Sequence, residues 1–160
     1  MNDKSYRKNV GLIVLNTSRK LLLCRRKHEK TWQFPQGGID QGETPAKAAY
    51  RELWEEVGIK KTQTRPITES IGWHSYELPP ELRKRSRSLK SFIGQTQKWF
   101  MLECRSDPII NFSIDEHQEF DRYAWVSYWY PLTKIVSFKK PVYQSVLNEF
   151  AKTYVKLSND

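Results

Sequence analysis

The segment 32–59 constrains the fold of this chain more than any other stretch, because it joins a loop rich in glycine and proline to a well-delimited helix. The loop reads WQFPQGGIDQGETP. Thr44 near its end is a suitable N-cap residue, Pro45 fits the first helical turn, and Gly58 can end a helix. We therefore predict a helix over residues 45–57 that is entered through a tight turn.

The predicted helix carries acids on one side and a separate apolar stripe. Glu52, Glu55 and Glu56 are spaced i, i+3 and i+4, so they project from the same side. The apolar stripe comprises Ala46, Ala49, Tyr50, Leu53 and Val57. Acids this close repel one another unless a cation lies among them, and carboxylate oxygens suit Mg²⁺ or Mn²⁺. An ordinary solvated helix face is the alternative, although the glycines before the helix would let backbone carbonyl groups reach the same ion.

Short apolar runs elsewhere in the chain predict a sheet. NVGLIVLN and KLLLCRR, joined by the polar turn NTSR, are typical of a β-hairpin. Residues 67–78, 95–104 and 122–129 are predicted to be further strands, so we expect a mixed or largely antiparallel sheet. A last helix is expected from Pro141. Its apolar stripe consists of Val142, Val146, Leu147, Phe150, Ala151 and Tyr154. The length suits a single domain, 1–160.

The balance of charges narrows the class of partner. Lys and Arg total 27 against 18 Asp and Glu, and the formal net charge of +9 favours polyanions such as nucleotides or nucleic acid. The basic segment 82–90, LRKRSRSLK, is predicted to be a mobile loop that is either simply solvated or attracts phosphates. No apolar run is long enough to span a membrane, so we expect a cytoplasmic protein with no membrane partner. Cys24 and Cys104 are expected to be reduced core residues.

Gly37, Glu43 and the run RELWEEVGI at 51–59 resemble a complete Nudix box over residues 37–59, with the pattern G-x5-E-x7-R-E-U-x-E-E-x-G-U in which U is aliphatic. The resemblance implies an α/β/α sandwich with a mixed central sheet, and hydrolysis of a nucleoside diphosphate linked to another group. It implies Mg²⁺, or Mn²⁺ in its place, with two or more ions when substrate is bound. The implied metal ligands are Glu52, Glu55, Glu56 and a backbone carbonyl of Gln36 or Gly37. Arg51 and Glu43 would tie the loop to the helix.

Hydrolysis by water also needs a general base. Glu52 is the first candidate, because it sits at the metal edge of the predicted helix. Glu119 is the rival and a further candidate metal ligand, because it lies where a loop meets the next predicted strand and could reach the ions from the opposite side. A plain surface carboxylate is the alternative role for Glu119.

Outside the box, the segments YRKNVGLIVLN, WQFPQGGI, IGQTQKWF, WVSYWYP and VSFKKPVY are similar to the bacterial RNA pyrophosphohydrolases. This resemblance covers residues 5–155. It implies that the substrate is RNA with a triphosphorylated or diphosphorylated 5′ end, and that the reaction promotes mRNA decay. Close relatives are described as dinucleoside polyphosphate hydrolases, so free dinucleotides are an alternative substrate. A non-catalytic binding module is a second alternative, and the sequence reveals no protein activator.

The expected substrate-binding residues combine cations with aromatic rings, as phosphates and bases require. The cations are Arg7, Arg26, Lys98 and Lys139, and the rings are those of Tyr76 and Phe138. By resemblance, Val136 and Ser137 join Phe138 and Lys139 in a nucleotide pocket. Phe138 has an alternative role as a core residue, and any one of the cations has an alternative role as a surface charge.

Overall fold

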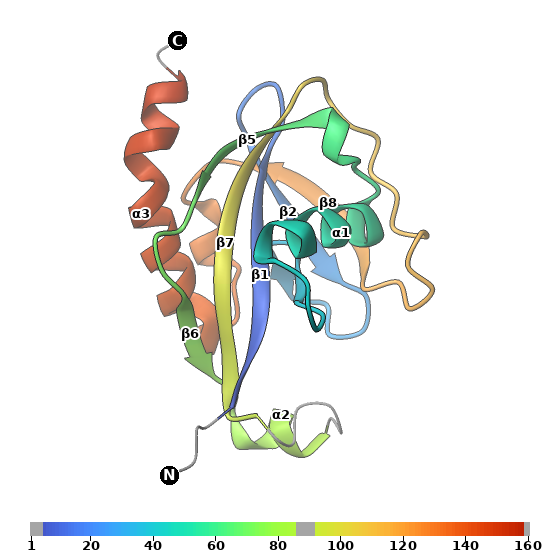
Figure 1. Ribbon diagram of the computed structural model, residues 1–160, viewed down its shortest axis with the longest axis vertical. Helices are drawn as coiled ribbons and strands as arrows, with labels where there is room; N and C mark the ends of the chain where they lie inside the picture. Colours follow the sequence, from blue (N-terminus) through green and yellow to red (C-terminus); the bar gives the residue numbers. More distant parts are fainter. Residues whose placement is uncertain (1–4, 86–91, 159–160) are drawn as a thin grey trace.

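The computed structural model describes residues 5–85 and 92–158, which form a mixed sheet covered by helices (Figure 1). The strands are β1 Tyr6–Leu15, β2 Leu21–Arg26, β3 Trp32–Gln33, β4 Gln36–Gly38, β5 Thr64–Glu69, β6 His74–Glu77, β7 Gly94–Cys104 and β8 Phe120–Val126. The helices are α1 Pro45–Val57, α2 Pro80–Arg85 and α3 Lys140–Ser158. Short 3₁₀ turns span Lys61–Gln63, Tyr130–Thr133 and Ser137–Lys139.

β1 and β7 run side by side in the middle of the sheet (Figure 1). They pair in parallel from Tyr6↔Gly94 to Leu15↔Glu103, whereas the other strand pairs in the described ranges are antiparallel. β1 and β2 form the predicted hairpin, with Leu15 opposite Leu21. The prediction of a mixed, largely antiparallel sheet is confirmed.

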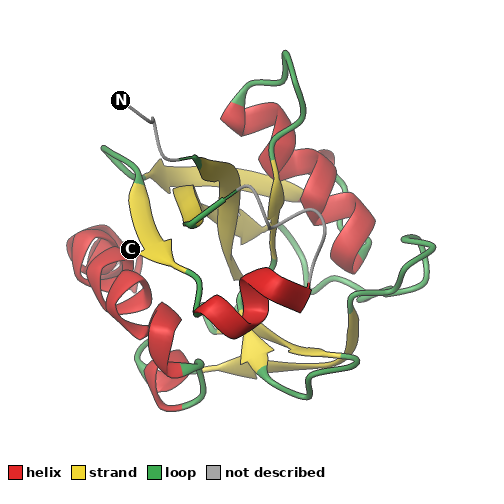
Figure 2. Cartoon of the chain, turned by 90° about the horizontal axis from the view of Figure 1, so that it is seen from below, coloured by secondary structure: helices red, strands yellow, loops and turns green. Residues whose placement is uncertain are grey.

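α1 and α3 cover opposite faces of the sheet (Figures 1 and 2). The alternation of side chains along β1 explains this arrangement. Leu12 and Val14 are buried in the core under α1, whereas Ile13 and Leu15 are buried in the core under α3. The predicted α/β/α sandwich is confirmed.

The apolar stripe of α3 is confirmed and that of α1 is corrected. In α3 the predicted stripe packs on the sheet as expected. In α1, Ala46 is exposed and Ala48 is buried. Ala48 begins an i, i+4 row that continues through Glu52 and Glu56, next to the buried apolar residues. The acids are therefore not on a separate solvated side: two of them lie along the margin of the core.

The ends of α1 are those predicted from the sequence. Thr44 Oγ1 accepts a hydrogen bond from the backbone amide of Lys47 at 3.2 Å, and Pro45 occupies the first turn. Gly58 has φ +73°, the left-handed conformation that ends helices and that glycine adopts without strain.

Three further sequence predictions need correction. The strand predicted at 122–129 is β8, Phe120–Val126, and it ends before the turn at residues 127–129. Residues 67–78 are not continuous strand, because the chain leaves the sheet between β5 and β6 at residues 70–73. The basic segment 82–90 is not all loop, because its first residues belong to α2, where Pro80 supplies a first-turn proline. Residues 86–90 lie outside the described residues.

Cys24 and Cys104 are both buried and free, as predicted. Burial raises the pKa of the Cys104 thiol to about 11 and also raises that of Cys24, so both stay protonated at neutral pH. In the described ranges, the helices lack the combination of length and apolar character that crossing a membrane requires.

Candidate active site

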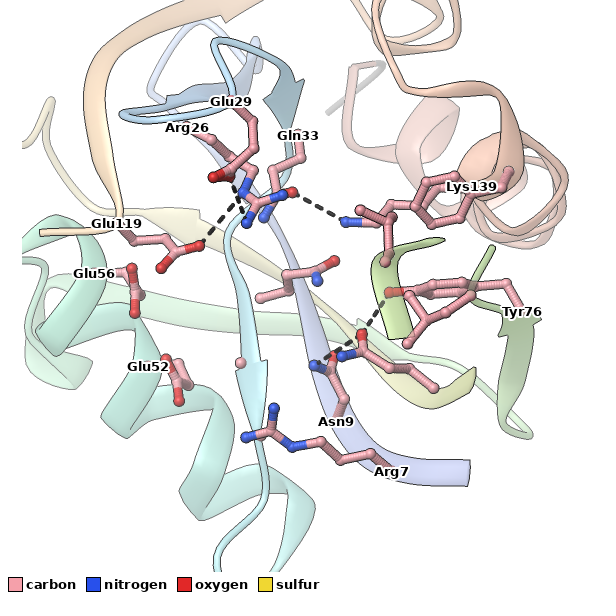
Figure 3. A pocket seen from close by; sticks show the side chains of 17 residues that line it. Arg7, Asn9, Arg26, Glu29, Gln33, Glu52, Glu56, Tyr76, Glu119 and Lys139 are labelled. Atoms are coloured by element: carbon pink, nitrogen blue, oxygen red, sulfur yellow. Dashed lines mark hydrogen bonds and ion pairs between the residues drawn. The ribbon is translucent and has the colours of Figure 1, made fainter. Parts of the chain in front are cut away.

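A cavity of about 650 Å³ opens between α1, the paired strands β1 and β4, and the turn that precedes α3 (Figure 3). Glu52 and Glu56 project toward it from α1, and Glu119 lies beside them. Lys139 and Tyr76 line the opposite wall. The cavity thus has an acidic end and a basic, aromatic end.

Arg51 ties the loop before α1 to the helix. Its Nε and Nη2 donate to the two carboxylate oxygens of Glu43 at 2.8 and 2.9 Å, and Nη2 also donates to the carbonyl oxygen of Gly38 at 2.8 Å. Glu43 accepts a further hydrogen bond from the backbone amide of Asp40. The hydrogen bonds from Arg51 lower the pKa of Glu43 to about 2, so this carboxylate stays ionised and the loop stays fastened across the physiological pH range.

Glu52 and Glu56 form a buried acid pair one turn apart on α1. They are only 6% and 9% exposed. Burial raises the pKa of both carboxyls, and the charge of Glu52 raises that of Glu56 further. Glu56 Oε2 is buried and has no hydrogen-bond partner among the described residues. Two carboxyls in such a place are costly to ionise unless a cation neutralises them.

Gly37 on β4 lies directly against Glu52 of this acid pair. A Cβ built on Gly37 would fall 2.0 Å from Cδ of Glu52, so only glycine leaves room for the carboxylate. Gln36, the preceding residue, also lines the cavity. A pair of carboxylates with a bare stretch of backbone beside them is the all-oxygen donor set that Mg²⁺ or Mn²⁺ prefers, so the residues present fit a divalent ion.

Glu55 lies outside the cavity. Its Oε2 accepts a hydrogen bond from Arg51 Nη1 at 3.1 Å, and Nη1 also donates to Glu52 at 2.9 Å. The Glu55 side chain is 43% exposed. Across the parts of the chain that the structure describes, no three acid, histidine or cysteine side chains are grouped so as to hold a metal ion. The hydrogen bonds that Arg51 Nη1 donates to Glu52 and Glu55 hold Glu55 next to Glu52 but outside the cavity.

Glu119 faces the acid pair from the segment that leads into β8. Its charge is one of the causes that raise the pKa of Glu56, and its Oε1 lies 3.5 Å from Arg26 Nε. Arg26 Nη2 lies 2.6 Å from Glu29 Oε2, so the guanidinium stands between two acids (Figure 3). Arg26 thereby separates the acidic end of the cavity from the basic end.

The basic, aromatic end is built around Lys139. This residue is buried, and its Nζ donates to Gln33 Oε1 at 3.1 Å. Nζ also lies 5.8 and 5.9 Å from the ring centroids of Tyr76 and Phe138, whose own centroids are 5.8 Å apart. Burial and the nearby charge of Arg26 lower the pKa of Lys139 to about 8, so it remains mostly cationic at neutral pH.

A row of buried amides, which the sequence analysis missed, connects the two ends. Gln97 Nε2 donates to Asn9 Oδ1 at 2.8 Å, and Asn9 Nδ2 lies 3.5 Å from Gln95 Oε1, which also accepts from the Tyr76 hydroxyl. Asn9 and Gln95 line the cavity. The sequence signal was the presence of Gln95 and Gln97 at alternate positions of β7, on the face that continues with the buried Trp99 and Met101.

Only some of the residues predicted to bind substrate line the cavity. Arg7 and Arg26 line the cavity with the residues described above, whereas Lys98, Val136 and Ser137 do not. Lys98 follows Gln97 on β7 and so faces the other side of the sheet, where its Nζ donates to the carbonyl oxygen of Ser70. Val136 and Ser137 lie in the turn just before Phe138.

The position of Phe138 is compatible both with stacking on a base and with a role in the core. Its ring lines the cavity, yet it also packs against the core under α3 and is only partly buried. Stacking of a base on an aromatic ring contributes about 1–3 kcal/mol, so Phe138→Ala should lower kcat/KM on a nucleotide substrate by about tenfold or more. Truncating a fully buried Phe costs about 3–5 kcal/mol of stability, and the loss here should be smaller. Kinetics measured beside the thermal unfolding temperature separate these effects.

A large drop in unfolding temperature, together with normal kinetics of the remaining folded enzyme, would contradict the stacking role of Phe138. Phe138→Tyr keeps an aromatic ring and serves as the matched control. It should retain most of the wild-type kcat/KM.

The chain is similar in sequence to a known protein family and to individual members of it. Residues 5–146 match the sequence profile of the NUDIX domain. The RNA pyrophosphohydrolases of Shewanella baltica (strain OS155) and Shewanella woodyi are 46% and 44% identical to the chain over 154 residues, which cover 96% of this chain and 88% of each relative.

Solved structures share the fold at lower sequence identity. The E. coli dihydroneopterin triphosphate pyrophosphohydrolase superposes with a TM-score of 0.71 and 22% identity, covering 91% of this chain and 99% of that one. A C. elegans Ap4A hydrolase superposes with a TM-score of 0.67 and 17% identity, covering 92% and 98%. At these identities the likeness concerns the fold alone.

Proposed function

Because the chain belongs to the Nudix hydrolase family, we propose that it is an RNA pyrophosphohydrolase, which removes pyrophosphate from the 5′ end of triphosphorylated RNA and leaves a 5′ monophosphate. The observation that carries the proposal is the 46% identity to RNA pyrophosphohydrolases over 96% of the chain, since this span includes the cavity walls outside the Nudix box. The reaction would promote mRNA decay. We place the enzyme in the cytoplasm, where its RNA substrate is made.

The two ends of the cavity suit the two parts of an RNA 5′ end. Arg7, Arg26 and Lys139 are cations that can bind phosphate oxygens. Phe138 and Tyr76 form an aromatic wall against which a base or ribose can pack. We propose that Val136 and Ser137 extend this wall beyond the cavity. We propose that Lys98 attracts the RNA phosphates through its positive charge without contacting the substrate in the cavity.

The acidic end would hold the divalent ions. We propose that Glu52 and Glu56 bind Mg²⁺, or Mn²⁺ in its place, together with a backbone carbonyl of Gln36 or Gly37, and that two or more ions are present with substrate. Such ions neutralise phosphate oxygens and lower the pKa of a coordinated water. Glu119 would approach from the facing wall. Glu55 would join them only if it released Arg51.

The chain must also take a proton from the water that attacks phosphorus. Glu52 is our first candidate for this base, because its carboxylate faces the bare backbone of Gly37 inside the cavity. Glu119 is the second candidate, because its side chain is 41% exposed and its Oε1 lies 3.5 Å from the cation Arg26. Arg51 and Glu43 keep the loop and helix in register throughout.

Free dinucleoside polyphosphates are the alternative substrate, because the same acidic end would serve both. A competition assay decides between them: triphosphorylated RNA and diadenosine tetraphosphate are supplied together, and the consumption of each is followed. We expect the RNA to be consumed preferentially. Preferential consumption of the dinucleotide would favour the alternative.

Salt should weaken RNA hydrolysis more steeply than dinucleotide hydrolysis. An RNA chain engages more protein cations through its backbone phosphates, and each such contact adds to the salt dependence of binding. The measurement is kcat/KM for each substrate over a range of monovalent salt at fixed Mg²⁺. Equal slopes for the two substrates would contradict the presence of RNA contacts beyond the 5′ end.

A further inference from the structure

A second cavity, of about 380 Å³, is lined by residues that the proposed reaction does not use. Its apolar lining residues include Leu23, Ala124 and Val126. Trp32, Tyr130 and Lys134 also line it. Tyr130 is 41% exposed, and Lys134 Nζ lies 5.9 Å from the centroid of its ring. We name this cavity the aromatic groove.

Two segments of the chain border both the aromatic groove and the active-site cavity. On β3, Trp32 lines the groove and the next residue, Gln33, lines the active-site cavity. Consecutive side chains of a strand point to opposite faces, so β3 divides the two spaces. Likewise Lys134 lines the groove, whereas Phe138 and Lys139 line the active-site cavity. The two spaces are therefore neighbours.

The chemistry of the aromatic groove suits single-stranded nucleic acid. Exposed aromatic rings stack on bases, and a nearby ammonium group binds the phosphate between them. Among the described residues that line the groove there is no acid to oppose a phosphate. Ser137, on the segment between the two spaces, is exposed and presents no bulky side chain there.

We propose that the aromatic groove binds the RNA chain on the 3′ side of the nucleotides held in the active-site cavity, with a base on Tyr130 or Trp32 and a phosphate at Lys134. This inference rests on the proposed function. It gives RNA a contact that a free dinucleotide is too short to make. The groove would therefore contribute to the preference for RNA over free dinucleoside polyphosphates.

The test compares two triphosphorylated substrates, a dinucleotide and a longer unstructured RNA, with the wild type, Tyr130→Ala and Lys134→Ala. Each substitution should lower kcat/KM for the longer RNA by about tenfold, the loss expected for one stacked base or its phosphate contact, mainly through KM. The dinucleotide rate should stay within about twofold of wild type. Tyr130→Phe keeps the ring and should behave as wild type. Lys152→Ala, which removes an exposed lysine of α3 outside the groove, controls for net charge.

Two results would overturn the inference while leaving the proposed function intact. Equal losses on both substrates would mean that the groove residues support the fold or the active site. No loss on either substrate would mean that the RNA chain does not bind in the groove. Failure of the wild type on both triphosphorylated substrates would overturn the proposed function and this inference together.

Discussion

Glu56→Gln is expected to lower turnover on triphosphorylated RNA by at least about a hundredfold, since charged groups in such sites are typically worth that much. The substitution keeps the shape of the side chain but removes the charge of a buried carboxylate whose Oε2 has no hydrogen-bond partner in the parts of the chain that the structure describes. The measurement is kcat at saturating Mg²⁺. A variant that keeps nearly the full rate would contradict the assignment of Glu56 to a metal site.

Stability measured without metal is the control for this prediction. Removing one of two crowded, buried acids should leave the unfolding temperature unchanged or higher, because the remaining acid loses a repulsive neighbour. Glu55→Gln is a matched substitution outside the cavity on the same helix, and we expect a milder loss of activity. A loss as severe as that of Glu56→Gln would mean that Glu55 leaves Arg51 and binds the ions too.

The base is identified by a parallel pair of substitutions. Glu52→Gln should be at least as damaging as Glu56→Gln if Glu52 both binds the ions and takes the proton. If Glu119→Gln proves far more damaging than Glu52→Gln, the role of base belongs to Glu119.

Gly37→Ala is expected to lower kcat by about a hundredfold while costing little stability. The new methyl group would lie 2.0 Å from Cδ of Glu52, so the carboxylate has to move. A carboxylate at the end of a flexible side chain moves at little cost to folding, but a displacement of about 1 Å in a catalytic group can cost about a hundredfold in rate. The measurements are kcat at saturating Mg²⁺ and the unfolding temperature.

Gly72→Ala is the matched control for Gly37→Ala. A Cβ built on Gly72 would meet no atom of residues 5–85 or 92–158 within 4 Å, and the backbone of Gly72 is not in the left-handed region. It should therefore keep wild-type activity. Normal activity of Gly37→Ala would mean that the position of Glu52 beside β4 does not matter for the reaction.

The features that the sequence predicted well are local ones. Thr44, Pro45 and Gly58 determine the ends of α1 through interactions within a few residues, so its bounds were predicted correctly. The parallel pairing of β1 with β7 joins residues about ninety positions apart, and strand patterns alone do not specify such a partner. The hairpin, by contrast, follows from its short turn.

The parts of the candidate site that were missed depend on contacts distant in sequence. The amide row needs Asn9 and Gln97 to meet across two strands, and the buried state of Lys139 depends on Gln33 and Tyr76 from elsewhere in the chain. The placement of Lys98 on the other face is a register effect that the sequence pattern contained, because Lys98 follows Gln97 directly.

The most direct test of the account is the fate of the 5′ end of a triphosphorylated RNA. The RNA is incubated with the purified protein, with Mg²⁺ and then with Mg²⁺ chelated, and the 5′ end and the released phosphates are identified. The account predicts RNA with a 5′ monophosphate and released pyrophosphate in the presence of Mg²⁺, and unchanged RNA when the ion is removed. An unchanged 5′ triphosphate under conditions in which the same sample hydrolyses diadenosine tetraphosphate would contradict it.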